Sequence, residues 1–380
     1  MPRIKNLENC IGCFACYNVC PNEAIRIDLT NEGFYVLQIN EFKCSDCGLC
    51  DKVCPILNLP IANEDRPVAY ASWSKDPEVR VKSSSGGVFS ELAKYVLKNG
   101  GIVYGVALDE NMTAKHIRVD TEDELEKLRG SKYIPSFVGN AYREAIEELK
   151  RKQVLFSGTP CQIAALNNIV KVSKVKINNL ITVDIVCHGV PSLKVFRMYL
   201  DYISKGRKVR KMSFRDKELG WSNYQIKIEF EDGVVYKATH RFGKVQDPFF
   251  KVYLMDLCLN KVCYNCPFSR IPRQGDITLG DFWGVPEDLK DEKGVSIVLV
   301  NNKKGKDFLE KVEGLEKMEV SLKLAAKSNK RIVSGDLSVP KAREKVLTAY
   351  NFEEIVRIAR KEERRKVWFL KVIPKLLLRE

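Results

Sequence analysis

Residues 10–21 read CIGCFACYNVCP, and residues 44–55 read CSDCGLCDKVCP. Both stretches follow the spacing C-x2-C-x2-C-x3-C-P, so the first part of the chain contains an internal repeat. Thiols packed this closely indicate metal-bound thiolates rather than a framework of disulfides. The repeat therefore predicts a small N-terminal module with two metal sites.

The order of these cysteines predicts which thiols share a metal site. In two-cluster ferredoxins with this spacing, three cysteines of a run bind one [4Fe-4S] cluster and the fourth binds the other. We therefore expect one cluster on Cys10, Cys13, Cys16 and Cys54, and a second on Cys44, Cys47, Cys50 and Cys20. Two zinc knuckles would need four cysteines within each half and would leave the repeated cysteine–proline pair unexplained. Residues 1–57 thus resemble a bacterial-type two-[4Fe-4S] ferredoxin domain, which implies electron transfer.

Between the two runs, residues 24–40 read AIRIDLTNEGFYVLQIN. Apolar and polar residues alternate on both sides of a polar centre that contains a glycine. This pattern predicts two short strands joined by a turn at Asn31–Gly33.

Composition and charge narrow the class of protein and the kinds of partner. The 380 residues are 45% hydrophobic and 29% charged, as in a soluble protein of roughly two to three domains. Thirteen cysteines, mostly clustered, predict a reducing and hence cytoplasmic compartment. The N-terminus lacks the apolar region of a signal peptide, and no apolar run predicts a membrane span. A net charge of +14 would attract a polyanion, but no helix-turn-helix, RNP-type or zinc-finger pattern supports nucleic acid.

The body of the chain begins after a polar, proline-flanked linker at 58–67. Residues 68–200 alternate short apolar runs with helical patterns, which predicts an α/β domain. Its expected strands are VAYASW, GIVYGVAL, QVLFSG and ITVDIV, and GVFSELAKYVLKNG is an expected helix that ends at Gly100. Residues 201–302 are β-rich, with a hairpin that turns at Asp232–Gly233 and a strand near Ile277–Leu279.

Residues 303–380 form a basic, helical C-terminal tail. Its last segment, ARKEERRKVWFLKVIPKLLLRE, combines Trp368, Phe369 and Leu376–Leu378 with many Lys and Arg residues. Such a helix could lie on a membrane surface or dock on a partner subunit, or it could pack an apolar face on its own core. The expected fold class is therefore α+β, with a ferredoxin fold, a mixed α/β domain and a helical tail.

Two strand-to-helix turns carry candidate binding residues. KSSSGG at 82–87 sets serines and two glycines at a helix N-terminus, which could bind a phosphate or be an ordinary serine cap. In FSGTPCQIAAL at 156–166, Thr159 is the expected N-cap, and Cys161 lies in the first turn, where the pKa of a thiol falls. Cys161 could be a nucleophile, a cluster ligand or a small buried residue.

A third turn, VDIVCHGVPS at 183–192, ends a predicted strand in Cys187 and His188. A histidine in this setting is more often a hydrogen-bonded structural residue than a catalytic one. We therefore assign no catalytic residue from the sequence.

Residues 258–268 read CLNKVCYNCPF and hold three thiols without a fourth ligand nearby. The spacing of Cys258, Cys263 and Cys266 matches three ligands of plant-type ferredoxins, whose fourth ligand is remote. Cys161 and Cys187 each follow a predicted strand and are the candidates for that ligand. A second possible set, Cys161, Cys187, Cys263 and Cys266, would leave Cys258 spare. Zinc is the alternative metal in this site.

Five motifs in order carry a family resemblance: SSSGGVFSELAKYVLKNG, LRGSKYIPS, VLFSGTPCQIAAL, DIVCHGVP and CYNCPFSRIPRQGDITLGDFWG. Across about 68–300 the chain resembles the family of coenzyme F420 hydrogenase/dehydrogenase beta subunits. The resemblance implies FAD, a third [4Fe-4S] cluster and hydride exchange with the deazaflavin coenzyme F420. The CHGVP and GDFWG forms are also similar to relatives encoded near surface-polysaccharide genes.

The resemblance also directs the choice of flavin-binding residues. The turn at 84–87 is expected to bind the pyrophosphate, and the full set of candidates is Lys82, Ser84, Ser85, Gly86, Gly87, Lys132, Tyr133, Gly158 and Thr159. Arg270 and Arg273 are expected to contact phosphates or the acidic tail of a deazaflavin, or else to be solvated surface arginines.

The expected function is that of an iron–sulfur flavoprotein oxidoreductase, which passes electrons between [4Fe-4S] clusters, FAD and a hydride carrier, with F420 as the leading candidate. One alternative is a flavin-dependent reductase of another small molecule, for example in polysaccharide metabolism. Another is a non-catalytic electron-relay subunit of a larger complex. The expected partner is a redox protein or complex subunit, such as a ferredoxin, hydrogenase or dehydrogenase. Peripheral membrane contact through the basic tail is also possible, and no nucleic acid is expected.

Overall fold

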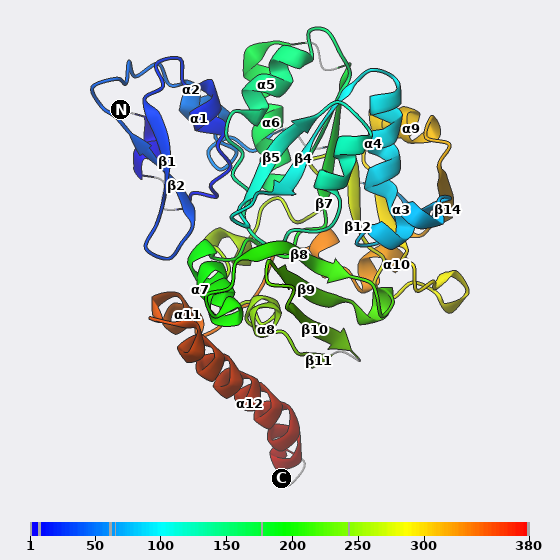
Figure 1. Ribbon diagram of the computed structural model, residues 1–380. Helices are drawn as coiled ribbons and strands as arrows, with labels where there is room; N and C mark the ends of the chain where they lie inside the picture. The colour runs from blue at the N-terminus through cyan, green and yellow to red at the C-terminus, as the bar shows by residue number, and fades with distance from the viewer. Residues whose placement is uncertain are drawn as a thin grey trace.

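The computed structural model (Figure 1) describes residues 2–6, 9–60, 63–64, 66–175, 178–241 and 244–377, with side chains except at 241, 244 and 365–377. An N-terminal domain with two helices and a hairpin lies beside a large mixed sheet, and a smaller antiparallel sheet and C-terminal helices follow. This arrangement confirms the expected α+β class.

The N-terminal domain repeats its backbone as well as its sequence. Its elements are a 3-10 helix η1 (Arg3–Asn6), α1 (Ala15–Val19), β1 (Ile25–Leu29), β2 (Tyr35–Ile39) and α2 (Leu49–Val53). Each short helix starts after a residue with left-handed backbone, Phe14 at φ 66° and Gly48 at φ 69°, and ends at the fourth cysteine of its run. The antiparallel pairing of β1 with β2 and the positive φ of Gly33 confirm the predicted hairpin.

The large sheet has eight strands in the order β14-β3-β13-β12-β7-β6-β4-β5. Their bounds are β3 (Val68–Ser74), β4 (Ile102–Leu108), β5 (Ala114–Val119), β6 (Val154–Gly158), β7 (Leu180–Ile185), β12 (Ile277–Asp281), β13 (Ser296–Val300) and β14 (Leu315–Val320). All five strands expected within 68–200 and at 277–279 are present. The sheet also takes β12 to β14 from beyond 200, so one sheet draws on three of the expected regions, and the division into domains at those boundaries stays a prediction.

Helices cover both faces of this sheet. The bounds of the covering helices are α3 (Pro77–Lys82), α4 (Val88–Lys98), α5 (Ala141–Glu148), α6 (Pro160–Ser173) and α9 (Lys303–Glu310). On one face α4 and α9 pack on Val103, Leu155 and Val298. On the other face α5 and α6 pack on Tyr104 and Phe156, together with α1 and α2 of the N-terminal domain. Neighbouring residues of a strand point to opposite faces, which explains this division.

The small sheet is antiparallel and has the order β11-β10-β9-β8. Its strands are β8 (Val209–Asp216), β9 (Gln225–Phe230), β10 (Val235–Arg241) and β11 (Lys244–Val245), and the predicted hairpin turns at Gly233, which has φ 85°. It shares a core with α7 (Leu193–Ser204), α8 (Pro248–Leu254), α11 (Arg343–Thr348) and the start of α12 (Phe352–Leu377).

The first half of α12 packs an apolar face on the chain's own core through Phe352, Ile355 and Ala359. In Figure 1 the second half runs away from the body. Leu378 lies outside the described residues, and so do the side chains of Trp368, Phe369 and Leu376. Within the described part of the chain, no helix combines the length and the apolar character needed to span a membrane.

Candidate redox centres

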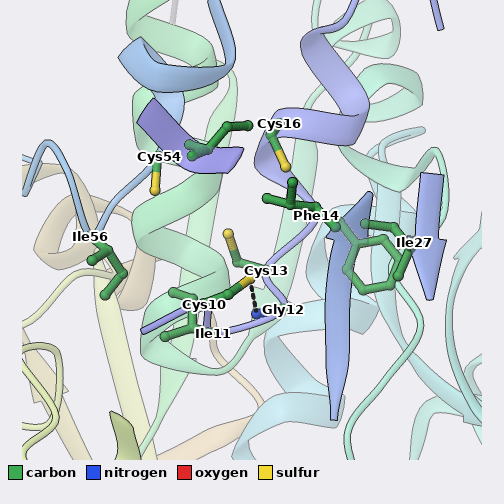
Figure 2. Close-up of a pocket in the computed structure, with 11 residues that line it drawn as sticks. Cys10, Ile11, Gly12, Cys13, Phe14, Cys16, Ile27, Cys54 and Ile56 are labelled. Carbon is green, nitrogen blue, oxygen red and sulfur yellow. Dashed lines mark hydrogen bonds between the residues drawn. The ribbon is translucent and has the colours of Figure 1, made fainter. Parts of the chain in front are cut away.

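Four cysteines of the N-terminal domain surround a first hollow. Figure 2 shows the thiols of Cys10, Cys13, Cys16 and Cys54 pointing into a common space. Apolar side chains complete the lining, namely Ile4, Ile11, Phe14, Ile27, Leu37 and Ile56. The backbone N–H of Gly12 donates to Cys10 Sγ at 3.4 Å. The structure thus brings together the four thiols that the spacing assigns to one cluster.

A second hollow is lined by the other four cysteines, Cys20, Cys44, Cys47 and Cys50. Cys50 is buried, whereas Cys47 is exposed. The backbone N–H of Ala24 donates to Cys20 Sγ at 3.3 Å. Because this set takes its fourth thiol from the other run, as the first set does, both hollows follow the crossed pairing of a two-cluster ferredoxin.

Burial dominates the electrostatics of these thiols. It raises the pKa of Cys10 and Cys54, raises that of Cys13 well above its usual value, and raises that of Cys50 to about 11. Iron binds the thiolate, so ligation would release the proton that burial favours. In the described part of the chain, no three His, Cys, Asp or Glu side chains are arranged around a single metal ion. A [4Fe-4S] cluster instead binds each thiolate through a different iron and needs more widely spaced sulfurs.

A third group of thiols forms at the carboxyl edge of the large sheet. Cys161 follows β6, Cys187 follows β7, and Cys263 and Cys266 come from the segment around the 3-10 helix η4 (Lys261–Tyr264). Burial raises the pKa of Cys161 well above its usual value, and Cys266, Cys187 and Cys263 raise it further. Burial raises the pKa of Cys187 to about 11 and that of Cys263 to about 12, with Cys266 and Cys187 respectively as the next contributors. Each of these three thiols therefore lies near others of the group.

Cys258 does not join this group. Its side chain is fully buried in the core shared by the small sheet and α7. Burial raises the pKa of Cys258 to about 12, and the charged neighbours that act on it are Asp256 and Arg343 rather than another thiol. This placement of Cys258 favours the second set, Cys161, Cys187, Cys263 and Cys266, over the set that includes Cys258, and the choice of ligands stays a prediction.

A row of hydrogen bonds fixes the turn that carries Cys161. Thr159 and Gln162 form the predicted cap of α6, and Thr159 Oγ1 lies 3.1 Å from Cys161 Sγ. Gln162 Nε2 donates to Ser136 Oγ at 2.9 Å, and Ser136 Oγ lies 3.2 Å from His116 Nδ1. The expected lowering of the Cys161 pKa at this helix start is wrong, because desolvation outweighs the helix dipole. Sequence analysis assigned no role to His116, which lies outside every recognised motif, or to Ser136, which is the last residue of the motif LRGSKYIPS.

The serine–glycine turn before α4 presents free backbone donors. Gly87 has φ 87°, and Gly86 donates to Ser296 Oγ at 3.0 Å, which holds the turn against β13. Within the described residues, the N–H groups of Ser84, Ser85 and Gly87 have no hydrogen-bond partner. The two serine hydroxyls do form hydrogen bonds. Ser84 Oγ accepts from the backbone N–H of Ser131, and Ser85 Oγ donates to Val295 O. The turn therefore has the donors that a phosphate needs at a helix N-terminus.

Two other residues of the expected flavin set have structural contacts. Lys132 donates through Nζ to the carbonyls of Lys127, Leu128 and Arg129, and burial lowers its pKa to about 7. Tyr133 accepts a hydrogen bond from Arg215 at 3.2 Å. Lys82 is exposed, and Gly158 and Thr159 belong to the turn that leads into α6.

The two candidate arginines differ in their environments. Arg273 is fully buried, and its guanidinium contacts Asp184 at 3.2 Å and Ile185 O at 2.9 Å. The expectation that it contacts a phosphate or solvent is therefore wrong, because a buried carboxylate neutralises it. Arg270 is partly exposed and its guanidinium lies 3.4 Å from Cys266 O, so it remains a candidate beside the third group of thiols.

An arginine and aromatic cluster, Arg215, Trp221, Tyr224, Asp281 and Trp283, lies next to the serine–glycine turn. The guanidinium of Arg215 bonds to both carboxylate oxygens of Asp281 and to Ser84 O, and it lies 3.8 Å from the centre of the Tyr224 ring. Trp221 and Trp283 stack with ring centroids 5.0 Å apart. No sequence motif includes Arg215. Of this cluster, only Asp281 and Trp283 belong to a recognised motif, GDFWG.

His188 follows Cys187 and faces Asp256, with Nε2 and Oδ1 2.8 Å apart but poorly aligned for a hydrogen bond. Its ring packs on Tyr253, and Arg331 donates to its carbonyl oxygen. These contacts agree with the expected structural role of His188.

Comparison with protein-family models matches three segments. Residues 9–57 match the 4Fe-4S dicluster domain. Residues 69–142 match the N-terminal region of the coenzyme F420 hydrogenase/dehydrogenase beta subunit, and residues 151–323 match its C terminus. The matched segments contain all of the cysteines discussed above.

Individual relatives extend this picture. A subunit of the F(420)H(2) dehydrogenase of Methanosarcina mazei is 30% identical over 167 residues, 41% of this chain and 47% of that protein, so the chain spans about half its length. An uncharacterized protein of Methanocaldococcus jannaschii is 24% identical over 361 residues, 82% of this chain and 90% of the relative. A chain of the F420-reducing [NiFe] hydrogenase complex from Methanosarcina barkeri has a similar fold, with a TM-score of 0.50 at 20% identity, over 71% of this chain and 92% of that chain.

Proposed function

This chain belongs to the family of coenzyme F420 hydrogenase/dehydrogenase beta subunits and carries a 4Fe-4S dicluster domain, and from this we propose that it is an iron–sulfur flavoprotein oxidoreductase. In this proposal it passes electrons between [4Fe-4S] clusters, FAD and a hydride carrier, for which coenzyme F420 is our candidate. The observation that carries the proposal is the alignment of thiols and free backbone donors along one edge of the large sheet.

The order of the strands sets the order of the candidate sites. β3, β12, β7 and β6 run parallel to one another, so their carboxyl ends share one edge. The serine–glycine turn lies at β3 and β13, Asp281 at β12, Cys187 at β7 and Cys161 at β6. Strands are spaced about 4.8 Å apart, so this whole row spans roughly 20 Å. Open α/β sheets bind ligands at this edge.

The chain's own groups suit a flavin at the β3 end of the row. The N–H groups of Ser84, Ser85 and Gly87 would bind phosphate oxygens, and Lys217 would hold the turn in place through its hydrogen bond to Ser85 O at 2.9 Å. The Arg215 and aromatic cluster would exclude water and offer flat surfaces and a fixed cation beside the ring system. A flavin exchanges both single electrons and electron pairs, which is the chemistry that would link clusters to a hydride carrier.

At the β6 end of the row, Cys161, Cys187, Cys263 and Cys266 would hold the third [4Fe-4S] cluster. Val190 donates its N–H to Cys263 Sγ at 3.3 Å, a contact that favours the thiolate. Arg331 joins the two halves of the site, because it donates to His188 O and to Cys263 O. The positive charge of Arg331 would partly offset the negative charge of four thiolates.

The proposal is tested by purifying the protein without oxygen and measuring its iron and flavin. We expect FAD and about twelve irons per chain from three clusters of four. Reduction of F420, NAD and NADP with reduced ferredoxin as donor would then identify the hydride carrier. Absence of flavin, or reduction of none of the three, would contradict the proposed function.

Two cysteine variants test the ligands of the third cluster. Cys187→Ala should lose about four irons and keep about eight, since one cluster of three is removed. Cys258→Ala is the matched control, because this buried thiol belongs to the same CLNKVCYNC segment but lies outside the group, and it should keep all of the iron. A loss of iron in Cys258→Ala alone would restore the set that includes Cys258.

A further inference from the structure

Two buried asparagines fix the N-terminal domain to the body of the chain. Asn18, on α1, donates to Gly139 O at 2.9 Å and accepts from the backbone N–H of Arg143 at 3.1 Å. Asn168, on α6, donates to Asn58 O at 2.7 Å, beyond the end of α2. Both asparagine side chains are about 95% buried. The first thiol group is therefore held firmly against α5 and α6.

Tyr142, on α5, lies in this contact between thiols of two different groups. Its side chain is fully buried, and its hydroxyl donates at 3.1 Å to the carbonyl oxygen of Gln162, the residue after Cys161. It shares one core with Cys13 and Phe14, and its ring packs on Phe156 with centroids 5.3 Å apart. Burial raises the pKa of Tyr142 well above its usual value, and the Cys13 and Cys161 thiols raise it further, so both thiols lie near its hydroxyl.

From this contact geometry we infer that Tyr142 is the positioning residue between the first and third cluster sites, and that electrons cross between those sites through its ring. The inference rests on the proposed function, because it requires [4Fe-4S] clusters at both sites. One electron leaves one cluster, which is oxidised, and enters the other, which is reduced. Tyr142 keeps its proton on the hydrogen bond to Gln162 O and undergoes no net chemical change.

The second cluster site lies at the outer end of the proposed electron path. Cys47, in that site, is exposed, and the neighbouring Phe42 is fully exposed. Cys13, in the first site, is buried in the core that the N-terminal domain shares with α5 and α6, whereas Cys16 is buried in the core of the N-terminal domain itself. The sites therefore run from the second, at the surface, to the first, across Tyr142 to the third, and on to the serine–glycine turn. An external one-electron carrier would exchange electrons at the second site.

The test is freeze-quench EPR spectroscopy of the full chain with its clusters, reduced by a limiting amount of dithionite. In Tyr142→Leu the ring is lost, and we expect electron transfer from the ferredoxin clusters to the third cluster to slow severalfold. Tyr142→Phe keeps the ring and should transfer electrons at close to the wild-type rate. Tyr104→Leu is the matched control, because Tyr104 is equally buried and stacks on the same Phe156 at 5.6 Å, but no cysteine thiol acts on its pKa.

A wild-type rate in Tyr142→Leu with its full iron content, or equal slowing in Tyr104→Leu, would overturn the inference. If Tyr142→Leu does not fold, the wild-type protein supplies the test. The EPR signal of the reduced first cluster should be broadened by the third, and Cys187→Ala should abolish this broadening. Absence of broadening would overturn the inference. A wild-type preparation with only about eight irons would overturn the proposed function as well, so iron content separates the two failures.

Discussion

His116 holds a neutral imidazole in the row of hydrogen bonds behind Cys161. Its Nε2 lies 3.2 Å from Ser157 O and must carry the proton, so Nδ1 accepts from the hydroxyl of Ser136. Burial lowers the pKa of His116 to about 4. A second proton on Nδ1 would remove the acceptor of the Ser136 hydroxyl, and burial disfavours the charged imidazolium, so the folded protein resists protonation.

His116 should therefore make the folded state less stable as the pH is lowered. The unfolded chain takes up a proton near pH 6.5, whereas the folded chain does so only near pH 4, so stability is lost as pH falls through this window. Between pH 7 and pH 5 the loss is about 2 kcal/mol. In His116→Gln this part of the pH dependence should disappear, as measured by denaturant unfolding at both pH values.

His240→Gln provides the control for this measurement. The pKa of His240 is also lowered by burial, but this residue lies in the small sheet and hydrogen-bonds to Tyr224. His240→Gln should keep most of the wild-type pH dependence. If His116→Gln loses stability between pH 7 and pH 5 as steeply as the wild type, the neutral state of His116 is not the cause.

At the scale of elements, α4 has a glycine with left-handed backbone at each end. Gly87 precedes its first turn with φ 87°, and Gly100 follows its last turn with φ 73°. An added Cβ at Gly87 would lie 3.1 Å from Val79 Cγ1 and 3.4 Å from Ser83 Oγ, whereas a Cβ at Gly100 would meet nothing within 4 Å. A side chain at Gly87 would therefore disturb the turn that carries the proposed phosphate donors, whereas a side chain at Gly100 would not.

This pair of glycines allows a matched test of the flavin site. Gly87→Ala and Gly100→Ala should each lose about 1–2 kcal/mol of stability, since both place a side chain in the left-handed region. Gly87→Ala should also reduce the flavin content per chain after anaerobic purification, because the serine–glycine turn must shift. Equal flavin content in the two variants would count against phosphate binding at this turn.

α6 is the element that links the sites. It starts at the turn of Cys161, which belongs to the third thiol group, and about two turns later Asn168 bonds to the segment that follows Cys54. A helix rises 1.5 Å per residue, so these two points lie about 10 Å apart along its axis. The same rigid helix therefore sets the separation of the first and third sites, and α5 adds Tyr142 beside it.

At the scale of the whole molecule, the cores depend on cysteine to different degrees. The buried core of the N-terminal domain is Ile4, Cys16, Ile25, Cys50 and Cys54, so three of its five members are thiols. The two cores that cover the faces of β12 and β13 contain no cysteine. We therefore expect the fold of the N-terminal domain to depend on bound clusters more strongly than the fold of the large sheet does.

Removal of iron by a strong chelator should accordingly unfold one part of the chain first. Hydrogen exchange followed by mass spectrometry should show loss of protection at 9–57, with β3, β12 and β13 still protected. The reason is that the thiols lose the bonds that tie them together, while the sheet keeps its apolar packing. Loss of protection in both regions to the same extent would show that the body also needs its cluster to fold.

The amino-acid sequence by itself determined the features that depend on near neighbours. The spacing within each run of four N-terminal cysteines, the hairpin at Gly33, the strands of the large sheet and the cap of α6 all follow from residues a few positions apart. Backbone geometry limits such short segments to few conformations, so spacing and turn chemistry were sufficient.

Only the tertiary structure decided the features that depend on strand order and burial. It placed Cys258 in a core and drew Cys161 and Cys187 to Cys263, about 70 to 100 residues away. It buried Arg273 against Asp184, gathered Arg215 with Asp281, and set Tyr142 between two thiol groups. These contacts exist because β12 inserts beside β7 and the N-terminal domain packs on α5 and α6, and no local pattern encodes either event.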